Sequence, residues 1–483
     1  MTDSKQFQNL IGGEWVSASN NAAFEDRSPA NPDDLIGMFP MATISDTNHA
    51  IEAARAALLN WAKTPPPARG AILDKASRLI DARLDELAAT LTREEGKTLA
   101  EARGEVSRAR DIFHYFAGEG WRTSGSVLPS NTDGELLYTR REPLGVVAIV
   151  TPWNFPIAIP TWKIAPALAY GNTVVFKPAS QTPLTALRLA EILVEAGLPP
   201  GVLNLITGSG REVGDTLTGS PKIDGISFTG SIGVGQHIYS RAFPNLTRVQ
   251  LEMGGKNPMV VLNDAKLDLA VDLVARSGFG LTGQACTATS RVIVEEGIAN
   301  SFAERLSEVA RKMVVGNGLK DGTQMGPAVS QDQLRTDLEY INIGKTEGAK
   351  LLAGGDIAGE GGYYVQPTVF DDVQIGMRIA QEEIFGPVIS IIRARNIDEA
   401  IEQANSVEFG LSAGIVTNDL QKAFAFANRI DAGVVKINEP TTGLALQAPF
   451  GGFKHSSANT FKEQGPAAVE FYTRIKTIYV GHG

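Results

Sequence analysis

The chain has 483 residues, of which 43% are hydrophobic, and it carries a formal net charge of −10. This length predicts two or more domains, and the acidic balance disfavours nucleic acid as a partner, because phosphate is bound by basic surfaces. A single cysteine excludes an intrachain disulfide framework and indicates a reducing compartment. The N-terminus has no apolar signal core, and no window approaches about 20 apolar residues, so we expect a cytoplasmic protein that does not bind membranes.

The first 142 residues are predicted to form helices between two hairpins. Gly12 and Gly13 are typical of the turn of a short hairpin. Within the second helical pattern, apolar residues recur at helical spacing along one face. The predicted elements are a hairpin at 9–16, helices at roughly 46–62, 67–92 and 98–117, and a projecting hairpin at 125–142.

From residue 145, short β-branched runs alternate with helical segments. This alternation is typical of consecutive βαβ units, and hence of a parallel sheet covered on both faces. The predicted strands are 146–150, 173–176, 202–206, 225–228 and 247–251, with helices at roughly 157–170, 182–196, 211–218 and 233–242.

A second α/β series begins near residue 258, which predicts a boundary near 253–256. The segment 466–480 returns to an extended, aromatic pattern and is expected to pair either with the hairpin at 125–142 or with another subunit. The second series comprises strands at 258–262, 292–294, 388–392 and 433–437 and a long helix at 329–347.

The only cysteine, Cys286, lies in a stretch of small residues that leaves room for a substrate. Two interpretations stay open at this point. An unpaired cysteine is most often a buried, small hydrophobic residue. A nucleophilic thiol needs a base or positive charge nearby, because at its free pKa only a few per cent of it is thiolate at neutral pH.

Two glutamates are candidates for that base. Glu252 ends the last strand of the first series and precedes Gly254 and Gly255, which permit a close backbone approach. Glu383 lies just before a turn at Gly386. The alternative interpretations are a strand-end cap for Glu252 and a surface ion pair for Glu383. The five histidines show no arrangement typical of a Cys–His dyad and are expected at the surface.

Polar groups follow three of the predicted strands. Asn154 carries a neutral amide donor suited to an oxyanion, although an Asx turn before Pro156 would also use it. The stretch FTGSIGVG at 228–235 opens a helix whose N–H groups can bind phosphate, but it lacks the strict dinucleotide spacing. Lys177 ends another strand. Ligands of parallel sheets bind beyond these carboxyl ends, so the three features together predict a nucleotide site.

Seven motifs in order make the chain resemble the aldehyde dehydrogenase superfamily over nearly its whole length. The resemblance implies an α/β fold with a Rossmann-like dinucleotide-binding domain (1–124 and 144–253), an α/β catalytic domain (254–440) and a β-hairpin oligomerisation element (125–143 and 460–483). The motifs are TPWNFP at 151–156, KPAS at 177–180, FTGSIGVG at 228–235, LEMGGKNP at 251–258, GQAC at 283–286, EEIFGP at 382–387 and PFGGFK at 449–454.

The resemblance also implies roles for individual residues. Cys286 would be the nucleophile, Glu252 the general base, and Asn154 would form the oxyanion hole with the backbone N–H of Cys286. Leu281 departs from the family, in which many members have Asn, but that position takes no part in the chemistry. No metal is implied. The residues implied to bind the dinucleotide are Trp153, Lys177, Ser180, Gly230, Ser231, Gly235, Met253, Glu383 and Phe385.

Ser180 stands where many NAD-preferring members of the family have Glu, whose carboxylate repels a 2′-phosphate. We therefore expect NADP as cofactor, with NAD also usable. Among subgroups, the chain is similar to the NAD(P)-dependent semialdehyde dehydrogenases that act on 2,5-dioxopentanoate (2-oxoglutarate semialdehyde) or on succinate semialdehyde.

Trp162 departs from the succinate semialdehyde enzymes, which typically have Arg there, so a substrate carboxylate would lose a bidentate partner. A broad-specificity enzyme for aliphatic or aromatic aldehydes is therefore an alternative, as are a coenzyme A-dependent enzyme and a non-catalytic relative. The expected partners are a small-molecule aldehyde and further copies of the chain, in a homodimer or homotetramer. The residues predicted to contact substrate are Phe155, Trp162, Phe279, Ala285 and Thr287.

Overall fold

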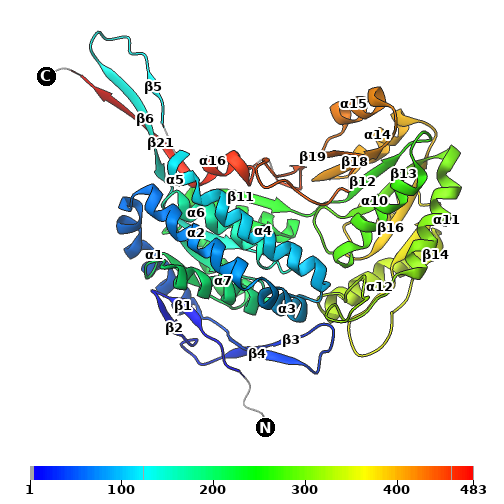
Figure 1. Ribbon diagram of the computed structural model, residues 1–483, viewed down its shortest axis with the longest axis horizontal. Coiled ribbons are helices and arrows are strands. Elements are labelled where there is room, and N and C mark those ends of the chain that lie inside the picture. The colour runs from blue at the N-terminus through cyan, green and yellow to red at the C-terminus, as the bar shows by residue number, and fades with distance from the viewer. Residues whose placement is uncertain (1–4, 123–124, 458–459, 482–483) are drawn as a thin grey trace.

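The computed structural model describes residues 5–122, 125–457 and 460–481. Within these residues, two seven-stranded sheets lie in separate halves of the molecule, each covered by helices (Figure 1). No helix in this part of the chain is long and apolar enough to cross a membrane. The predicted α/β class is confirmed.

The first sheet has the strand order β11-β10-β7-β8-β9-β1-β2, with β7 to β11 parallel and the edge pair β1 and β2 antiparallel. The strands β7 and β8 are almost entirely buried because helices cover both faces of a parallel sheet. The strands are β1 (Asn9–Ile11), β2 (Glu14–Val16), β7 (Val146–Val150), β8 (Thr173–Lys177), β9 (Leu203–Leu205), β10 (Gly225–Gly230) and β11 (Arg248–Met253), and the helices between them are α6 (Ala158–Ala169), α7 (Pro183–Ala196), α8 (Asp215–Gly219) and α9 (Ile232–Ala242).

The N-terminal helices pack against this sheet half (Figure 1). The single helix predicted at 67–92 is wrong, because the backbone of Arg83 leaves the helical region (φ −116°, ψ 20°) and divides it. Neither glycine nor proline marks that break. The elements are the hairpin β3 (Ala23–Arg27) and β4 (Leu35–Pro40) and the helices α1 (Ile44–Lys63), α2 (Pro66–Ala82), α3 (Leu84–Glu95), α4 (Leu99–Ala117) and α5 (Glu119–Arg122).

The second sheet has the order β14-β15-β16-β13-β12-β18-β19 and is parallel except for β14. The chain changes sheets between β11 and β12, whereas the exact domain ranges remain predictions. The strands are β12 (Asn257–Val261), β13 (Thr289–Glu295), β14 (Lys350–Ala353), β15 (Thr368–Asp371), β16 (Val388–Ala394), β18 (Ser412–Val416) and β19 (Val434–Ile437), and the helices are α10 (Leu267–Phe279), α11 (Glu296–Lys312), α12 (Gln331–Thr346), α13 (Arg378–Gln381), α14 (Ile397–Asn405) and α15 (Leu420–Arg429).

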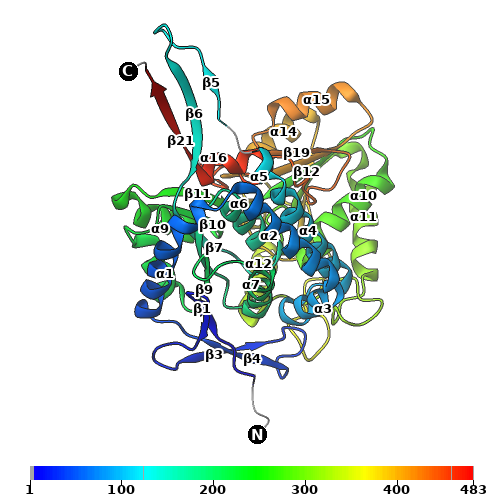
Figure 2. The ribbon, with the colours of Figure 1, turned by 60° about the vertical axis from the view of Figure 1, so that its left-hand side comes forward.

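A three-stranded arm projects from the first half (Figures 1 and 2). It contains β5 (Val127–Leu128), β6 (Leu136–Pro143) and β21 (Thr473–Val480), and β21 pairs with β6 along eight residues. The extended pattern expected from residue 466 is wrong before β21, where α16 (Ala468–Tyr472) is helical. The helix turns Phe471 and Tyr472 into the core, where both are buried.

A buried ammonium joins the helices to the segment that follows β7. Lys97 Nζ donates to Glu105 Oε2 of α4 at 2.6 Å and to the carbonyl oxygen of Asn154 at 2.7 Å. Glu105 Oε1 accepts the backbone N–H groups of Ile157 and Ala158 at 3.0 and 3.1 Å. Because all these groups are buried, the position of Asn154 depends on the ion pair of Lys97 and Glu105.

We expect the substitution Lys97→Met to destabilise the protein by about 3–5 kcal/mol, because it leaves the buried Glu105 carboxylate without its counter-charge. Arg103→Met on the same helix is the control, since its ion pair with Asp85 is exposed and worth about 1 kcal/mol or less. Urea-induced unfolding measures both. Similar losses for the two variants would contradict this role of Lys97.

Candidate active site

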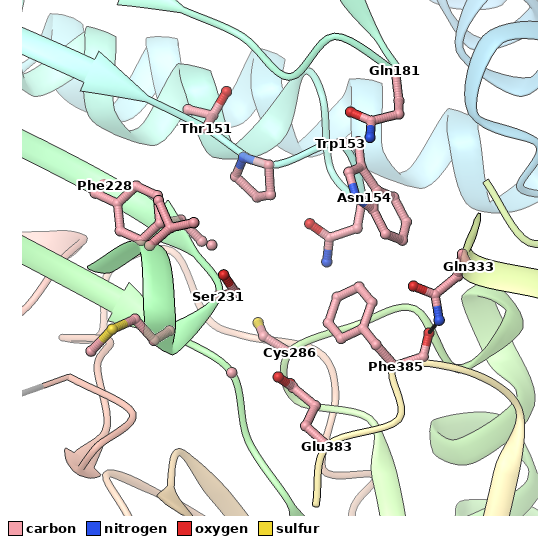
Figure 3. Close-up of a pocket in the computed structure, with 16 residues that line it drawn as sticks. Thr151, Trp153, Asn154, Gln181, Phe228, Ser231, Cys286, Gln333, Glu383 and Phe385 are labelled. Carbon is pink, nitrogen blue, oxygen red and sulfur yellow. Dashed lines mark hydrogen bonds between the residues drawn. The ribbon is translucent and has the colours of Figure 1, made fainter. Parts of the chain in front are cut away.

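A cavity of about 490 Å³ opens between the two sheets, beyond the carboxyl ends of β7, β10 and β11. Figure 3 shows Cys286, Asn154, Glu383 and Phe385 pointing into it. This is the edge at which parallel sheets bind ligands. The lining residues are Thr151, Pro152, Trp153, Asn154, Gln181, Phe228, Thr229, Gly230, Ser231, Val234, Met253, Gly254, Cys286, Gln333, Glu383 and Phe385.

The cysteine is presented by an unusual backbone between α10 and β13. Leu281 and Thr282 have positive φ angles of 55° and 57°, which cost energy in non-glycine residues. Gly283, with φ 68°, passes so close to Gly386 that a Cβ atom there would lie 2.3 Å from the Gly386 carbonyl oxygen. The carbonyl of Cys286 accepts from Asn257 Nδ2 at 2.8 Å. The strained segment therefore fixes the position of the thiol.

The surroundings of the thiol are acidic. Burial, followed by the negative charges of Glu383, Glu252 and Glu463, raises the pKa of Cys286 to about 12. The thiol of the free protein is therefore protonated at neutral pH, so it needs a base or a change in these charges before it can act as a nucleophile.

The amide of Asn154 points toward Cys286 (Figure 3). Its Nδ2 donates one hydrogen to the carbonyl oxygen of Gln284 at 2.9 Å. An amide nitrogen carries two hydrogens, so one remains for a further acceptor near the thiol. The side chain is 2% exposed and its Oδ1 has no partner among the described residues.

Glu252, in β11, lies behind the cavity and does not line it. Its carboxylate accepts from the backbone N–H of Gly452 and from Ser457 Oγ, both at 3.3 Å. A Cβ atom on Gly451 would lie 2.3 Å from Oε1, so the glycine is needed for this approach. Burial and the neighbouring Glu463 raise the pKa of Glu252 well above its usual range, as suits a group that exchanges protons.

The other glutamate, Glu383, faces the cavity itself. Its Oε1 accepts the backbone N–H of Gly255 at 2.9 Å, and burial raises its pKa to about 7. Two residues later, Phe385 has a positive φ of 63° and packs edge-on against Trp153, with ring centroids 5.4 Å apart. Gln333 Nε2 donates to the carbonyl of Phe385 at 3.3 Å and so supports this turn.

The glycine-rich stretch opens helix α9, with Ser231 at its N-cap position. Gly230 and Ser231 line the cavity, whereas Gly235 is buried where a Cβ atom would lie 2.3 Å from Met253 Sδ. Gly235 therefore lets α9 pack closely on β11. Thr229 Oγ1 lines the same wall and is buried without a partner among the described residues.

Lys177 ends β8 and Ser180 follows it, and both lie outside the lining of the cavity, although Gln181 is part of that lining. Lys177 Nζ contacts the carbonyl of Pro178 at 3.3 Å, and burial lowers its pKa to about 8. Ser180 is exposed, and its Oγ lies 3.5 Å from the carbonyl oxygen of Gly208. A polar ligand extending from the cavity along this edge would meet both.

The five residues predicted to contact substrate lie in different environments. Ala285 and Thr287 flank the thiol and are buried. Trp162 is buried with its ring 6.1 Å from that of Phe450, and Phe155 lies 4.5 Å below the Lys97 ammonium. The prediction that Phe279 contacts substrate is wrong, because its side chain is wholly buried in the hydrophobic core of the second half and cannot line a channel.

Several lining residues were missed from the sequence. Gln181 and Gln333 lie in no motif that marks them, and Gln333, on α12, comes 47 residues after Cys286 in the chain. Only the fold brings that helix to the cavity. The four histidines within the described residues are exposed, as expected, while His482 lies outside those residues.

We expect Glu383→Gln to speed alkylation of Cys286 by iodoacetamide roughly 3- to 10-fold above pH 7, where the native carboxylate is charged and disfavours the thiolate. Below pH 7 the two proteins should react alike. Glu382→Gln is the control, because that exposed carboxylate is paired with Arg378. Equal alkylation rates across the pH range would contradict the electrostatic account.

Comparison with known proteins agrees with this geometry. The profile described as aldehyde dehydrogenase family matches residues 15–478. The chain is 47% identical to 2,5-dioxopentanoate dehydrogenase of Saccharolobus solfataricus over 99% of this chain and 100% of that protein. It is 49% identical to alpha-ketoglutarate semialdehyde dehydrogenase of Haloferax volcanii over 99% of each chain.

Solved structures give the same result. Betaine aldehyde dehydrogenase of Staphylococcus aureus in complex with NAD+ superposes with a TM-score of 0.95 at 36% identity, covering 98% of this chain and 94% of that one. An Escherichia coli NADP dependent enzyme gives a TM-score of 0.96 at 38% identity, with 99% and 98% covered. The chain belongs to the aldehyde dehydrogenase family.

Proposed function

We propose that the protein oxidises an acid semialdehyde, 2,5-dioxopentanoate, to the dicarboxylate with NAD(P) as hydride acceptor. The observation that carries the reaction type is the juxtaposition of Cys286 and the Asn154 amide at one end of a cavity whose other walls suit a dinucleotide. The names of the two related proteins that share nearly half of their residues with this chain support the substrate class.

The cavity residues fit a dinucleotide. The N-terminus of α9 has no side-chain cap, so its first N–H groups can bind a phosphate, and Thr229 Oγ1 is a buried polar atom without a partner among the described residues. Trp153 and Phe385 offer an apolar wall for a ring, and Glu383 an acceptor for hydroxyl groups. When bound, the cofactor accepts the hydride that leaves the aldehyde carbon.

Cys286 performs the first step of the proposed mechanism. Its thiol gives its proton to one of the surrounding carboxylates, and the thiolate adds to the aldehyde carbon. The C=O electron pair moves to the oxygen, whose negative charge Asn154 Nδ2 and the Cys286 N–H stabilise. Loss of hydride from this tetrahedral species leaves a thioester on Cys286. Because the amide is already held by Gln284 and the backbone of Asn154 by Lys97, little reorganisation is needed.

Glu252 acts in the second step by taking a proton from the water that hydrolyses the thioester. Burial raises its pKa above the usual range, which makes the ionised carboxylate a stronger base, and the absence of a side chain at Gly451 gives that carboxylate room. The same group argues against the coenzyme A-dependent alternative, whose members generally lack this glutamate.

NADP is the proposed preferred cofactor, with NAD also usable. Ser180 is exposed and neutral, and Lys177 on the same edge adds a positive charge that a 2′-phosphate would meet. The related structures include one described as NADP dependent and others bound to NAD+, so both cofactors fit this fold.

The arm is the proposed oligomerisation element of a homodimer or homotetramer. Exposed apolar side chains gather on its strands, which is unusual for a surface that faces water. They are Val127, Leu128, Leu136, Ile475, Tyr479 and Val480.

We expect Glu252→Gln to release about one equivalent of NADPH per active site and then turn over 10²- to 10⁴-fold more slowly than the native enzyme, on the order expected for loss of a general base. Stopped-flow absorbance measures the burst. Cys286→Ala is the control that should give no burst while still binding NADPH. Normal steady-state turnover in Glu252→Gln would refute its role as base.

A carboxylate at position 180 should reverse the cofactor preference. We expect Ser180→Glu to lower kcat/KM for NADP at least about tenfold and to leave NAD little changed, because the new charge repels only the 2′-phosphate. Ser240→Glu adds the same charge at an exposed position of α9 and controls for net charge. An unchanged ratio in Ser180→Glu would contradict the assignment.

A further inference from the structure

Arg108 of α4 is a partly buried cation without a counter-ion. Its neighbours Arg103 and Arg110 form ion pairs with Asp85 and Asp81. Among the described residues, no carboxylate lies within ion-pair distance of Arg108, whose two hydrogen bonds go to neutral acceptors. These are the carbonyl oxygen of Leu444 and, at 2.8 Å, Gln464 Oε1.

Such an arrangement is costly, since a buried charge is normally compensated by an opposite one. Burial removes part of the water around the guanidinium, and this loss of solvation lowers the pKa of Arg108. A guanidinium has five N–H groups, of which two are used here, leaving three in a planar fork. Carboxylates are the ligands that this fork binds best.

The guanidinium lies beside Trp162, one of the predicted substrate residues. Its central carbon lies 5.9 Å from the centre of the Trp162 ring, and that ring faces Phe450 at 6.1 Å. Directly after Phe450, Gly452 donates to the carboxylate of Glu252. Arg108 therefore contacts Trp162, which packs against Phe450 of the loop that holds the proposed base, Glu252.

A second connection leads to the nucleophile. Leu444, which accepts from Arg108, lies in the loop after β19. Thr441 of the same loop donates from its Oγ1 to the carbonyl of Thr287 at 2.7 Å. Thr287 is the residue after Cys286. One helical turn before Arg108, Glu105 holds the backbone just beyond Asn154. Neither Arg108 nor Trp162 nor Leu444 lines the proposed dinucleotide cavity, so a ligand of the guanidinium would lie outside that cavity.

We propose that Arg108 is the specificity-determining residue that binds the carboxylate of the acid semialdehyde, at the end remote from the aldehyde. It would replace the guanidinium that this chain lacks at Trp162. This inference rests on the proposed function and deepens it. A purely structural Arg108 that only fixes the loop at Leu444 would instead affect every aldehyde equally.

The test compares acid and neutral aldehydes of matched length. Arg108→Gln and Arg108→Lys are assayed with 2,5-dioxopentanoate and succinate semialdehyde against pentanal and butanal. We expect Arg108→Gln to raise KM for the acids about 10- to 100-fold, the range for a lost charge-assisted hydrogen-bonded pair, with kcat changed little. The KM values for pentanal and butanal should stay within about twofold.

Arg108→Lys should fall between the native enzyme and Arg108→Gln, since it keeps the charge but loses the fork. Arg103→Gln on the same helix is the control and should leave all four substrates unchanged. Equal losses on acid and neutral aldehydes, or unchanged KM values for the acids, would overturn the assignment of Arg108.

The native enzyme provides an independent measurement should the variants fail to fold. Pentanoate should inhibit pentanal oxidation competitively at least about tenfold more strongly than pentanamide, because only the carboxylate engages the guanidinium. Equal inhibition would overturn the proposal. A native enzyme that oxidised pentanal but no acid semialdehyde would contradict the proposed function itself, whereas one that oxidised both while Arg108→Gln kept its discrimination would contradict only the role of Arg108.

Discussion

The hydrogen bonds of one buried ammonium, that of Lys97, hold the active site together. It neutralises Glu105, fixes the carbonyl of Asn154 and lies over the ring of Phe155. The same stretch of chain packs on the second half of the molecule, where Leu99 donates to the carbonyl of Gly318 at 3.0 Å. The distance between the Asn154 amide and Cys286, which come from different halves, therefore depends on this cation and its partners.

Burial in the site favours the protonated forms of the thiol and of two carboxyl groups. Burial raises the pKa values of Cys286, Glu252 and Glu383, so each of these groups keeps its proton to a higher pH than it would in water. The negative charge of these carboxylates disfavours the thiolate and so slows its reaction with electrophiles. Arg108 is the reverse case, a cation kept without a carboxylate until substrate supplies one.

Much of the fold could be predicted, because each βαβ unit is marked in the local sequence by β-branched runs and by glycines at the turns. The break at Arg83 and the burial of Phe279 could not, since neither carries a local signal and both depend on tertiary packing. For the site, motifs placed Cys286, Asn154 and Glu383 at one cavity. Lys97, in the loop between α3 and α4, and Gln333 and Arg108, on helices, escaped notice because such polar side chains normally face water. Only contacts distant in sequence reveal their burial or partners.

The central claim is that the reaction passes through a thioester on Cys286. Rapid acid quenching of the native enzyme with 2,5-dioxopentanoate and NADP, followed by peptide mass spectrometry, tests it most directly. We expect an acyl adduct on the peptide that contains Cys286, present only when the cofactor is included. NADPH formed in the first turnover with that peptide unmodified would contradict it.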